Sequence, residues 1–299
     1  MTASPWHAGE LALQRSVGVA EQMDRVGRIV LRPYLPDQHR AFFALLPFIV
    51  IGAVDPDGAP WATIRAGQPG FMHSPDPTLL AVEAMRDHAD PAERGMTDGA
   101  PVGLLGIDLA TRRRNRLNGR LHRSDDRRFT VEVGQSFGNC PRFITRRQVE
   151  FMRDPALPSA SPAAMVDALD GAARRIIEAA DTFFVASYGD TGADGRQVDV
   201  SHRGGAPGFV RIGADGSLTV PDYGGNLFFN TLGNFLLNPR AGLLFVDLHS
   251  GTALQLCGKV DIILDSPAIA TFEGAERLWR LMPEKIVYRT DALPFRWAP

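Results

Sequence analysis

The stretch VDVSHRGGAPGFVRI at residues 198–212 has a fainter copy upstream, WATIRAGQPGFM at residues 61–72. When the two are aligned on their shared Pro-Gly-Phe, Arg65 falls on Arg203 and the flanking glycines also coincide. Each copy has the pattern of a β-strand followed by a turn that depends on glycine. A strand and turn that recur with the same residue types indicate a duplication within the chain.

A second pair of blocks repeats in the same order. GLLGIDLATRRRNRLNGRL at residues 103–121 matches GLLFVDLHSGTALQLCGKV at residues 242–260, and its offset differs from that of the first pair by a single residue. Residues 152–165 are rich in Pro, Ala and Ser, as expected of a linker. We therefore predict two tandem domains, residues 1–151 with leading helices and residues 152–299.

Local patterns predict similar elements in both halves. They are, in the first half, a helix at residues 37–46 with Asp37 as N-cap and strands at 47–54 and 61–67, and, in the second, a helix at 161–181 with Ser161 as N-cap and strands at 182–188 and 197–203. A last helix is expected to begin at Ser266 and to carry Phe272, Leu278, Trp279 and Leu281. Short strands joined by Gly/Asp turns favour small antiparallel barrels. The expected fold is mainly β with flanking helices.

The composition is that of an ordinary globular protein and argues against several classes. Hydrophobic residues make up 44% and charged residues 22% of the 299 residues, and the net charge is −2. No global field therefore draws the chain to nucleic acid or to an acidic membrane. The longest apolar stretch, residues 41–54, is too short for a membrane span. Without a signal-peptide pattern or a disulfide framework for Cys140 and Cys257, we expect a cytoplasmic protein.

The second half contains polar residues that the matching part of the first half lacks. The segment NTLGN predicts a short helix whose start presents Asn230 and Thr231. The free N–H groups and the dipole at a helix start suit an anion, and the guanidinium of Arg203 can bind two phosphate oxygens at once. Together they predict a phosphate site. The alternative is that Asn230 or Thr231 only caps the helix and that Arg203 pairs with a surface acid.

Several segments, taken in order, carry a recognisable pattern. They are HAGELALQRSVGV at residues 7–19, FGNCPRFITRR at 137–147, QVDVSHRGGAPGFV at 197–210, PDYGGNLFFNTLGN at 221–234, NPRAGLLFVDLHSGTALQLCG at 238–258 and ALPFRW at 292–297. This set resembles the FMN-binding split barrels of the pyridoxamine 5'-phosphate oxidase superfamily, and in particular its two-barrel branch of flavin-nucleotide-binding proteins. The resemblance covers nearly the whole chain. It implies two tandem FMN-binding split barrels.

The resemblance also implies a set of residues for the FMN site. They are Val200, Ser201 and His202 along the isoalloxazine ring, Arg203 at the phosphate, Asn226, Asn230, Thr231 and Asn234 as polar partners, and Gln255 on the flavin. Thr231 stands where the oxidases carry a second phosphate-binding lysine, so the site would be less basic here. The start of the helix would partly compensate for that missing cation.

In this superfamily FMN lies between two barrels, which usually belong to two subunits. Two barrels in one chain would then form an intramolecular pseudo-dimer that binds one FMN. The second half would hold the phosphate, and the first half with the segment GNCPRF at residues 138–143 would form the other wall. Arg65 would keep the shape of the barrel but not the task of Arg203.

Other candidate groups have simpler explanations. Asp199, Ser201 and His202 suggest a hydrolytic triad, but adjacent strand residues such as Ser201 and His202 point to opposite faces. The histidines show no close-pair spacing and neither cysteine lies in a C-x-x-C pair, so no metal site is expected. The basic run at residues 112–116 is expected at a solvated hairpin tip. Alternatively, it attracts a phosphorylated substrate or an acidic partner.

The function expected from these observations is that of an FMN-binding oxidoreductase that transfers a hydride or electron through flavin N5. Its partner would be a small-molecule substrate or an electron donor such as NAD(P)H. Because the cofactor carries this chemistry, no protein acid or base is required; His202 is the first candidate for proton handling and Cys140 is a candidate near the flavin. The alternatives are a non-catalytic flavin- or haem-binding protein and a deazaflavin-dependent reductase. Two chains could also form a homodimer.

Overall fold

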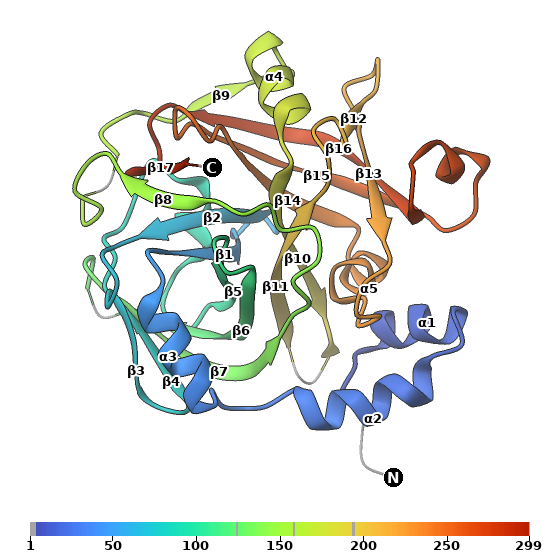
Figure 1. Ribbon diagram of the computed structural model, residues 1–299, viewed down its shortest axis with the longest axis horizontal. Helices are drawn as coiled ribbons and strands as arrows, with labels where there is room; N and C mark the ends of the chain where they lie inside the picture. The colour runs from blue at the N-terminus through green and yellow to red at the C-terminus, as the bar shows by residue number, and fades with distance from the viewer. Residues whose placement is uncertain (1–3, 124, 158, 193–194, 299) are drawn as a thin grey trace.

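The computed structural model describes residues 4–123, 125–157, 159–192 and 195–298. Its helical segments are α1 (Ala8–Ser16), α2 (Ala20–Val30), α3 (Asp37–Leu45), the short 3₁₀ turn η1 (Pro91–Gly95), α4 (Gly171–Ala179), α5 (Asn230–Leu237) and the 3₁₀ turn η3 (Pro267–Thr271). Within the described ranges no helix is long and apolar enough to cross a membrane. Although α1 begins the chain, it packs beside α5 of the second half (Figure 1).

Each half of the chain forms its own antiparallel sheet. The strands of the first are β1 (Phe48–Val54), β2 (Pro60–Ala66), β3 (Met72–Asp76), β4 (Leu79–Val82), β5 (Pro101–Asp108), β6 (Arg113–His122) and β7 (Phe129–Gly138). Those of the second are β10 (Thr182–Asp190), β11 (Arg196–Gly204), β12 (Arg211–Ile212), β13 (Leu218–Tyr223), β14 (Arg240–Val246), β15 (Ala253–Ile263) and β16 (Ala275–Arg289).

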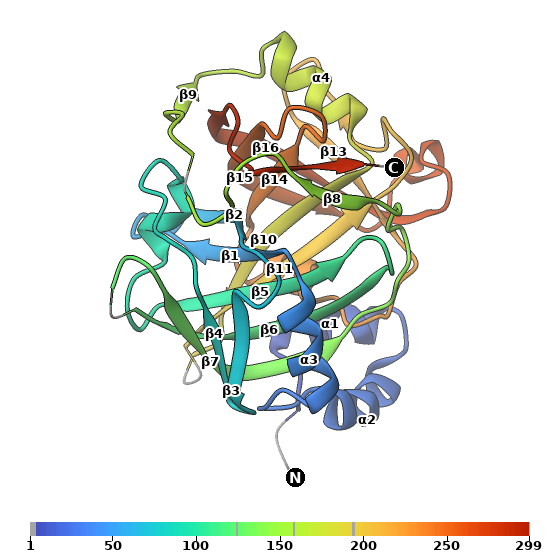
Figure 2. The same cartoon turned by 60° about the vertical axis from the view of Figure 1, so that its left-hand side comes forward.

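The two sheets have the same strand order. The first runs β2-β1-β5-β6-β7-β4-β3 and the second β11-β10-β14-β15-β16-β13-β12, so every strand of one has a counterpart in the other. Three short strands lie outside this scheme: β8 (Gln148–Phe151) pairs with β17 (Phe295–Ala298), and β9 (Ala164–Val166) pairs with β16 (Figure 2). The predicted fold, mainly β and built from two tandem barrels, is confirmed.

The central strands are apolar on both faces because each face meets a different core. In β1, Ile49 and Ile51 belong to the core of the first barrel, whereas Val50 packs in a core that both halves share. In β10, Phe183 lies in the core of the second barrel and Phe184 in the shared core. Since successive strand residues point to opposite faces, this alternation places the shared core between the two barrels.

Two glycines from the sequence repeat lie where the halves touch most closely. A Cβ atom on Gly103 would lie 2.8 Å from the Cα of Asp199, and one on Gly242 would lie 2.8 Å from the Cα of Trp61. Each contact is the counterpart of the other, because Gly103 aligns with Gly242 and Trp61 with Asp199. The halves therefore pack as an intramolecular pseudo-dimer, and the repeated glycines allow this close backbone approach.

The structure corrects two predicted helices. In place of a helix from Ser161, residues 164–166 form strand β9, and α4 begins only at Gly171, where the Asp170 carboxylate accepts a hydrogen bond from the Ala173 amide at 2.8 Å. In place of a last helix, η3 ends after one turn and the chain enters strand β16. The apolar side chains of Leu278, Trp279 and Leu281 were therefore expected on the wrong element. Asp37 is the first residue of α3, with Pro36 at the N-cap.

Candidate binding site between the halves

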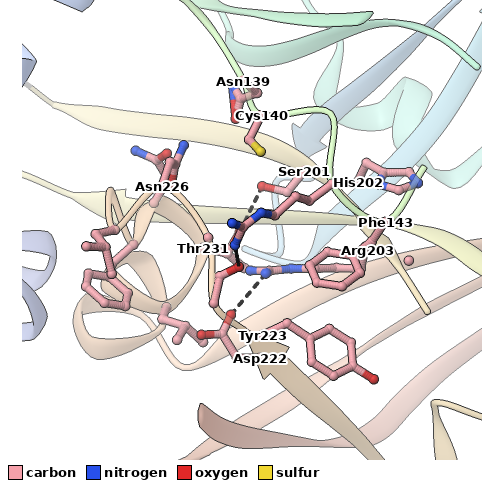
Figure 3. A pocket seen from close by; sticks show the side chains of 18 of the residues that line it. Asn139, Cys140, Phe143, Ser201, His202, Arg203, Asp222, Tyr223, Asn226 and Thr231 are labelled. Atoms are coloured by element: carbon pink, nitrogen blue, oxygen red, sulfur yellow. Dashed lines mark hydrogen bonds and ion pairs between the residues drawn. The ribbon is translucent and has the colours of Figure 1, made fainter. Parts of the chain in front are cut away.

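A cavity lies at the end of β11 and is closed by residues of both halves (Figure 3). It encloses about 110 Å³ and opens into a depression of about 870 Å³ that includes solvent at its mouth. Of the predicted site residues, the cavity brings together Cys140, Ser201, His202, Arg203, Asn226, Asn230 and Thr231.

Arg203 lies at the end of β11, where the sequence places it, and it is paired. It donates a hydrogen bond to the Asp222 carboxylate at 3.0 Å, and Arg277 approaches the other oxygen of the same carboxylate at 3.2 Å. The side chain of Arg203 nevertheless lines the cavity and is 22% exposed. Both interpretations of Arg203 thus apply in part, because it has an acidic partner and also faces the cavity.

Two further arginines of the cavity come from the first half. Arg116 on β6 is buried and donates to both oxygens of Asp199, at 2.9 and 3.1 Å, and to the side-chain oxygen of Asn230 at 3.0 Å. It also donates to the Ser201 hydroxyl. Arg114, two positions earlier on the same face of the strand, lines the same cavity. Only the tip of the basic run is solvated, so the predicted hairpin-tip location was wrong for these two residues.

Arg114 has no carboxylate partner among the described residues. Its Nε donates to the backbone carbonyl of Cys140 at 2.8 Å, and its Nη1 lies 3.3 Å from Nδ1 of His202. Burial, together with the neighbouring charges of Arg116 and Arg203, lowers the pKa of Arg114 to about 9. The guanidinium is therefore still charged at neutral pH, but it is destabilised by its surroundings.

His202 is a buried, neutral side chain. Burial and the charges of Arg114 and Arg203 hold its pKa well below the usual value. Because a guanidinium can only donate, Nδ1 accepts from Arg114, and the ring proton sits on Nε2, 3.4 Å from the Thr182 hydroxyl. This arrangement leaves no N–H for a ligand and does not favour the predicted proton-handling role. It also shows no triad, since the hydrogen bond of Ser201 goes to Asp199.

The start of α5 contributes neutral polar groups to the cavity. The hydroxyl of Thr231 lies 2.9 Å from that of Ser201, and the Asn230 side chain accepts from Arg116. Asn226 accepts a hydrogen bond from the Phe228 amide at 3.2 Å and so shapes the turn that leads into the helix. Neither Asn230 nor Thr231 caps α5, whose N-cap is Phe229.

Three predicted residues do not line the cavity. Val200 is buried in the core shared by the halves, and Asn234 donates to the Ser187 hydroxyl at 3.0 Å. Gln255 is buried elsewhere and donates to Ala62 O and to Asp90, both at 3.0 Å. The repeat explains this result for Gln255. Its aligned residue in the first half is Arg116, and each barrel sends this strand position into the site of the other barrel.

The segment after β7 closes the cavity from the first-half side, as predicted for GNCPRF. Cys140 lies across the cavity from Asp222 and Tyr223 (Figure 3). Phe143 packs on the ring of Tyr223 with centroids 4.9 Å apart. The lining residues Phe143, Leu227 and Phe229 have φ angles of 63°, 63° and 60°. Left-handed backbone at bulky residues is strained and tends to occur at functional sites.

The charge of the lining is strongly unbalanced. Among its described residues are the arginines 114, 116, 142, 203 and 277 and one carboxylate, that of Asp222. Asp199 neutralises Arg116 from behind, and Glu276 contacts Arg277. A buried charge without a partner is unfavourable, so this arrangement suits an anionic ligand. No cluster of three or more potential metal ligands occurs within the described part of the chain.

Comparisons with known proteins give structural neighbours only. No family model matches the sequence, and no curated protein does. Among solved structures, 40% of this chain covers 98% of HupZ from Group A Streptococcus at 14% identity and a TM-score of 0.33. A pyridoxamine 5'-phosphate oxidase-related, FMN-binding protein from Nostoc punctiforme matches over 40% of this chain and 82% of its own, at 13% identity and a TM-score of 0.30.

A third neighbour is HutZ, described as a haem storage protein, from Vibrio cholerae. It matches over 41% of this chain and 95% of its own, at 14% identity and a TM-score of 0.29. The neighbours thus include proteins of the superfamily that the sequence resembles. At these TM-scores they add no argument to the fold, which rests on the strand order and pairing of the two sheets.

Proposed function

We propose that this chain binds one FMN in the cavity between its halves and acts as a flavin-dependent oxidoreductase. The observation that carries the proposal is the buried, unneutralised cation Arg114 beside Arg116 and Arg203. A phosphate monoester brings nearly two negative charges and three acceptor oxygens. It would satisfy the guanidiniums that the protein itself leaves without a carboxylate.

The donor set fits the phosphate end of such a cofactor. Arg114, Arg203 and the hydroxyl of Thr231 would hold it, and Arg116 would add charge from the rear of the cavity. The enclosed 110 Å³ is smaller than a typical small-molecule site of roughly 300–1,000 Å³, so the rest of the ligand would occupy the open depression. Bound flavin would supply hydride or electron transfer. The chain would orient it and keep the phosphate dry.

The spectrum of the purified protein, with mass spectrometry of the released ligand, tests this proposal. We expect a flavin spectrum, a released mass equal to FMN, and one flavin per chain. NAD(P)H or another donor should bleach that spectrum if the protein turns over. Two flavins per chain would contradict the single site, and a colourless protein that refuses FMN would contradict the proposal.

The same spectrum separates the rival ligands. A Soret band would indicate haem, and a released deazaflavin would indicate a reductase of that type. Haem ligation has little support from the cavity, because the imidazole of His202 is already engaged on both nitrogens. Riboflavin, which has no phosphate, provides the matched control ligand. It should bind much more weakly than FMN if the arginines recognise the phosphate.

A further inference from the structure

The helix α1 reaches the binding cavity from behind, through its contact with α5. A Cβ atom on Gly9 would lie 2.0 Å from the carbonyl oxygen of Gly233, and one on Gly233 would lie 2.7 Å from the backbone nitrogen of Glu10. Neither helix has room for a methyl group at this crossing. The close contact brings Glu10 to the first turn of α5, where the Asn230 amide donates to its carboxyl at 2.5 Å.

A chain of hydrogen bonds runs from Glu10 into the cavity. The Asn230 side chain gives its N–H to Glu10 and accepts through its oxygen from Arg116. Both ends of this amide are thus engaged, which sets its orientation. Arg116 in turn donates to Ser201, whose hydroxyl lies beside that of Thr231. A buried carboxyl outside the cavity is therefore connected to an arginine inside it.

We propose that Glu10 is a positioning residue, which holds Arg116 in the binding cavity through Asn230 and does so as an uncharged carboxylic acid. This inference rests on the anion-binding function proposed above. It assigns a role to an N-terminal helix that belongs to neither barrel sheet.

The surroundings of Glu10 favour the uncharged form. Burial raises the pKa of Glu10 to about 8, although the hydrogen bonds from His7 and Asn230 act in the opposite direction. The titratable and charged groups that face it are His7 at the start of α1, Asp199 on β11 and Arg116 on β6. His7 is neutral, because burial lowers its pKa. From α5 and β7 come only amides among the described lining residues.

Ionisation of Glu10 would weaken anion binding. Above about pH 8 a second carboxylate would stand beside Asp199 and offset the charge of Arg116. The affinity for FMN should then fall as the pH rises through 8, and the free protein should also lose stability there. The sign follows because the folded-state pKa of Glu10 is raised, so proton loss is opposed by the fold.

The test compares Glu10→Gln with Glu10→Ala, and uses Glu21→Gln on the exposed face of α2 as control. The first readout is hydrogen exchange of α5 in the ligand-free protein, followed by mass spectrometry. We expect faster exchange in Glu10→Ala and wild-type exchange in Glu10→Gln. Equal exchange in all variants would overturn the positioning role, whatever the protein binds.

The second readout is the affinity for FMN and for inorganic phosphate from about pH 6.5 to about pH 9. Glu10→Ala should lose about three- to tenfold in affinity, whereas Glu10→Gln should bind as wild type at low pH and lack the fall near pH 8. A Glu10→Gln protein that keeps this fall would overturn the inference. A wild type that binds neither probe would contradict the proposed function, and hydrogen exchange would still decide the role of Glu10.

Discussion

The two halves place an arginine at the same position of equivalent strands and surround it differently. Arg65 on β2 is 6% exposed and donates to Asp90 at 2.8 Å and to Glu93 at 2.6 Å. Arg203 on β11 has a single carboxylate partner, Asp222, and faces a cavity. One barrel fills the space around its arginine with its own acids, and the other leaves room for an anion from outside.

The difference lies in one connection of the sheet. In the second half the chain passes from β13 to β14 through α5, whose start presents Asn230 and Thr231. In the first half it passes from β4 to β5 through η1, which brings Asp90 and Glu93 onto Arg65. Neutral donors in one connection and carboxylates in the other turn two copies of a scaffold into one open and one closed site.

The opposite barrel reinforces the contrast. Arg114 and Arg116 reach the open site from β6, and the residues aligned with them on β15 are Ala253 and Gln255. At the closed site, Arg289 contacts Asp87 and lies 3.3 Å from Asp90. Burial alone would raise the pKa of Asp90, but Arg65 and Arg289 lower it to about 2. The closed site is therefore an internally compensated ion cluster.

The largest effect should come from opening the closed site. Asp90→Asn leaves the buried Arg65 and Arg289 without their shared carboxylate, and we expect the free energy of unfolding to fall by about 3–5 kcal/mol. Urea denaturation measures it. The matched change Asp222→Asn should lose less, because its partner Arg203 is partly exposed. Equal losses would show that the two clusters are energetically alike.

The next effect concerns ligand affinity. Arg203→Ala should weaken FMN binding by about 1.5–3 kcal/mol, the scale of a hydrogen bond to a charged group. Arg65→Ala should leave the affinity nearly unchanged and reduce stability in its place, because Arg65 is engaged within the closed cluster. Fluorescence titration with FMN and thermal unfolding separate the two outcomes. Equal losses of affinity in both variants would refute the asymmetry.

A smaller effect should appear at alkaline pH. Arg114 loses its proton above its pKa of about 9, and a phosphate ligand binds the protonated form, so the affinity should fall as the pH rises, about tenfold at one unit above that pKa. The measurement is best made in Glu10→Gln, which removes the earlier step. Arg114→Ala should bind weakly at all pH values without this fall. An unchanged slope in Arg114→Ala would exclude Arg114 as its source.

The sequence predicts the duplicated barrels well because the repeat is itself a record of the fold. The aligned glycines Gly103 and Gly242 lie at the contact between the halves, and the NTLGN segment forms the predicted helix. The helix expected from Ser161 was wrong because strand pairing with β16 overrides the local pattern at residues 164–166. Long-range pairing of this kind leaves no local signal.

The site was predicted in part, and the missing part belongs to the other half. Arg114 and Arg116 were assigned to a solvated tip because nothing local shows which face of a strand the second barrel will cover. Gln255 was placed in the cavity by analogy within its own half, although the packing exchanges this position between barrels. The charges of an interface follow from how the halves dock, and that is a property of the whole chain.

The smallest effect is expected at Cys140, and it tests whether the first half contributes chemistry or only a wall. It is the backbone carbonyl of Cys140, not its thiol, that holds Arg114. Cys140→Ser keeps that carbonyl, so FMN affinity should change by less than about 0.5 kcal/mol. The rate of flavin reduction by NAD(P)H in a stopped-flow experiment should also stay the same. A large loss of rate with unchanged affinity would instead make the thiol a catalytic group, and the first half would then do more than supply charge.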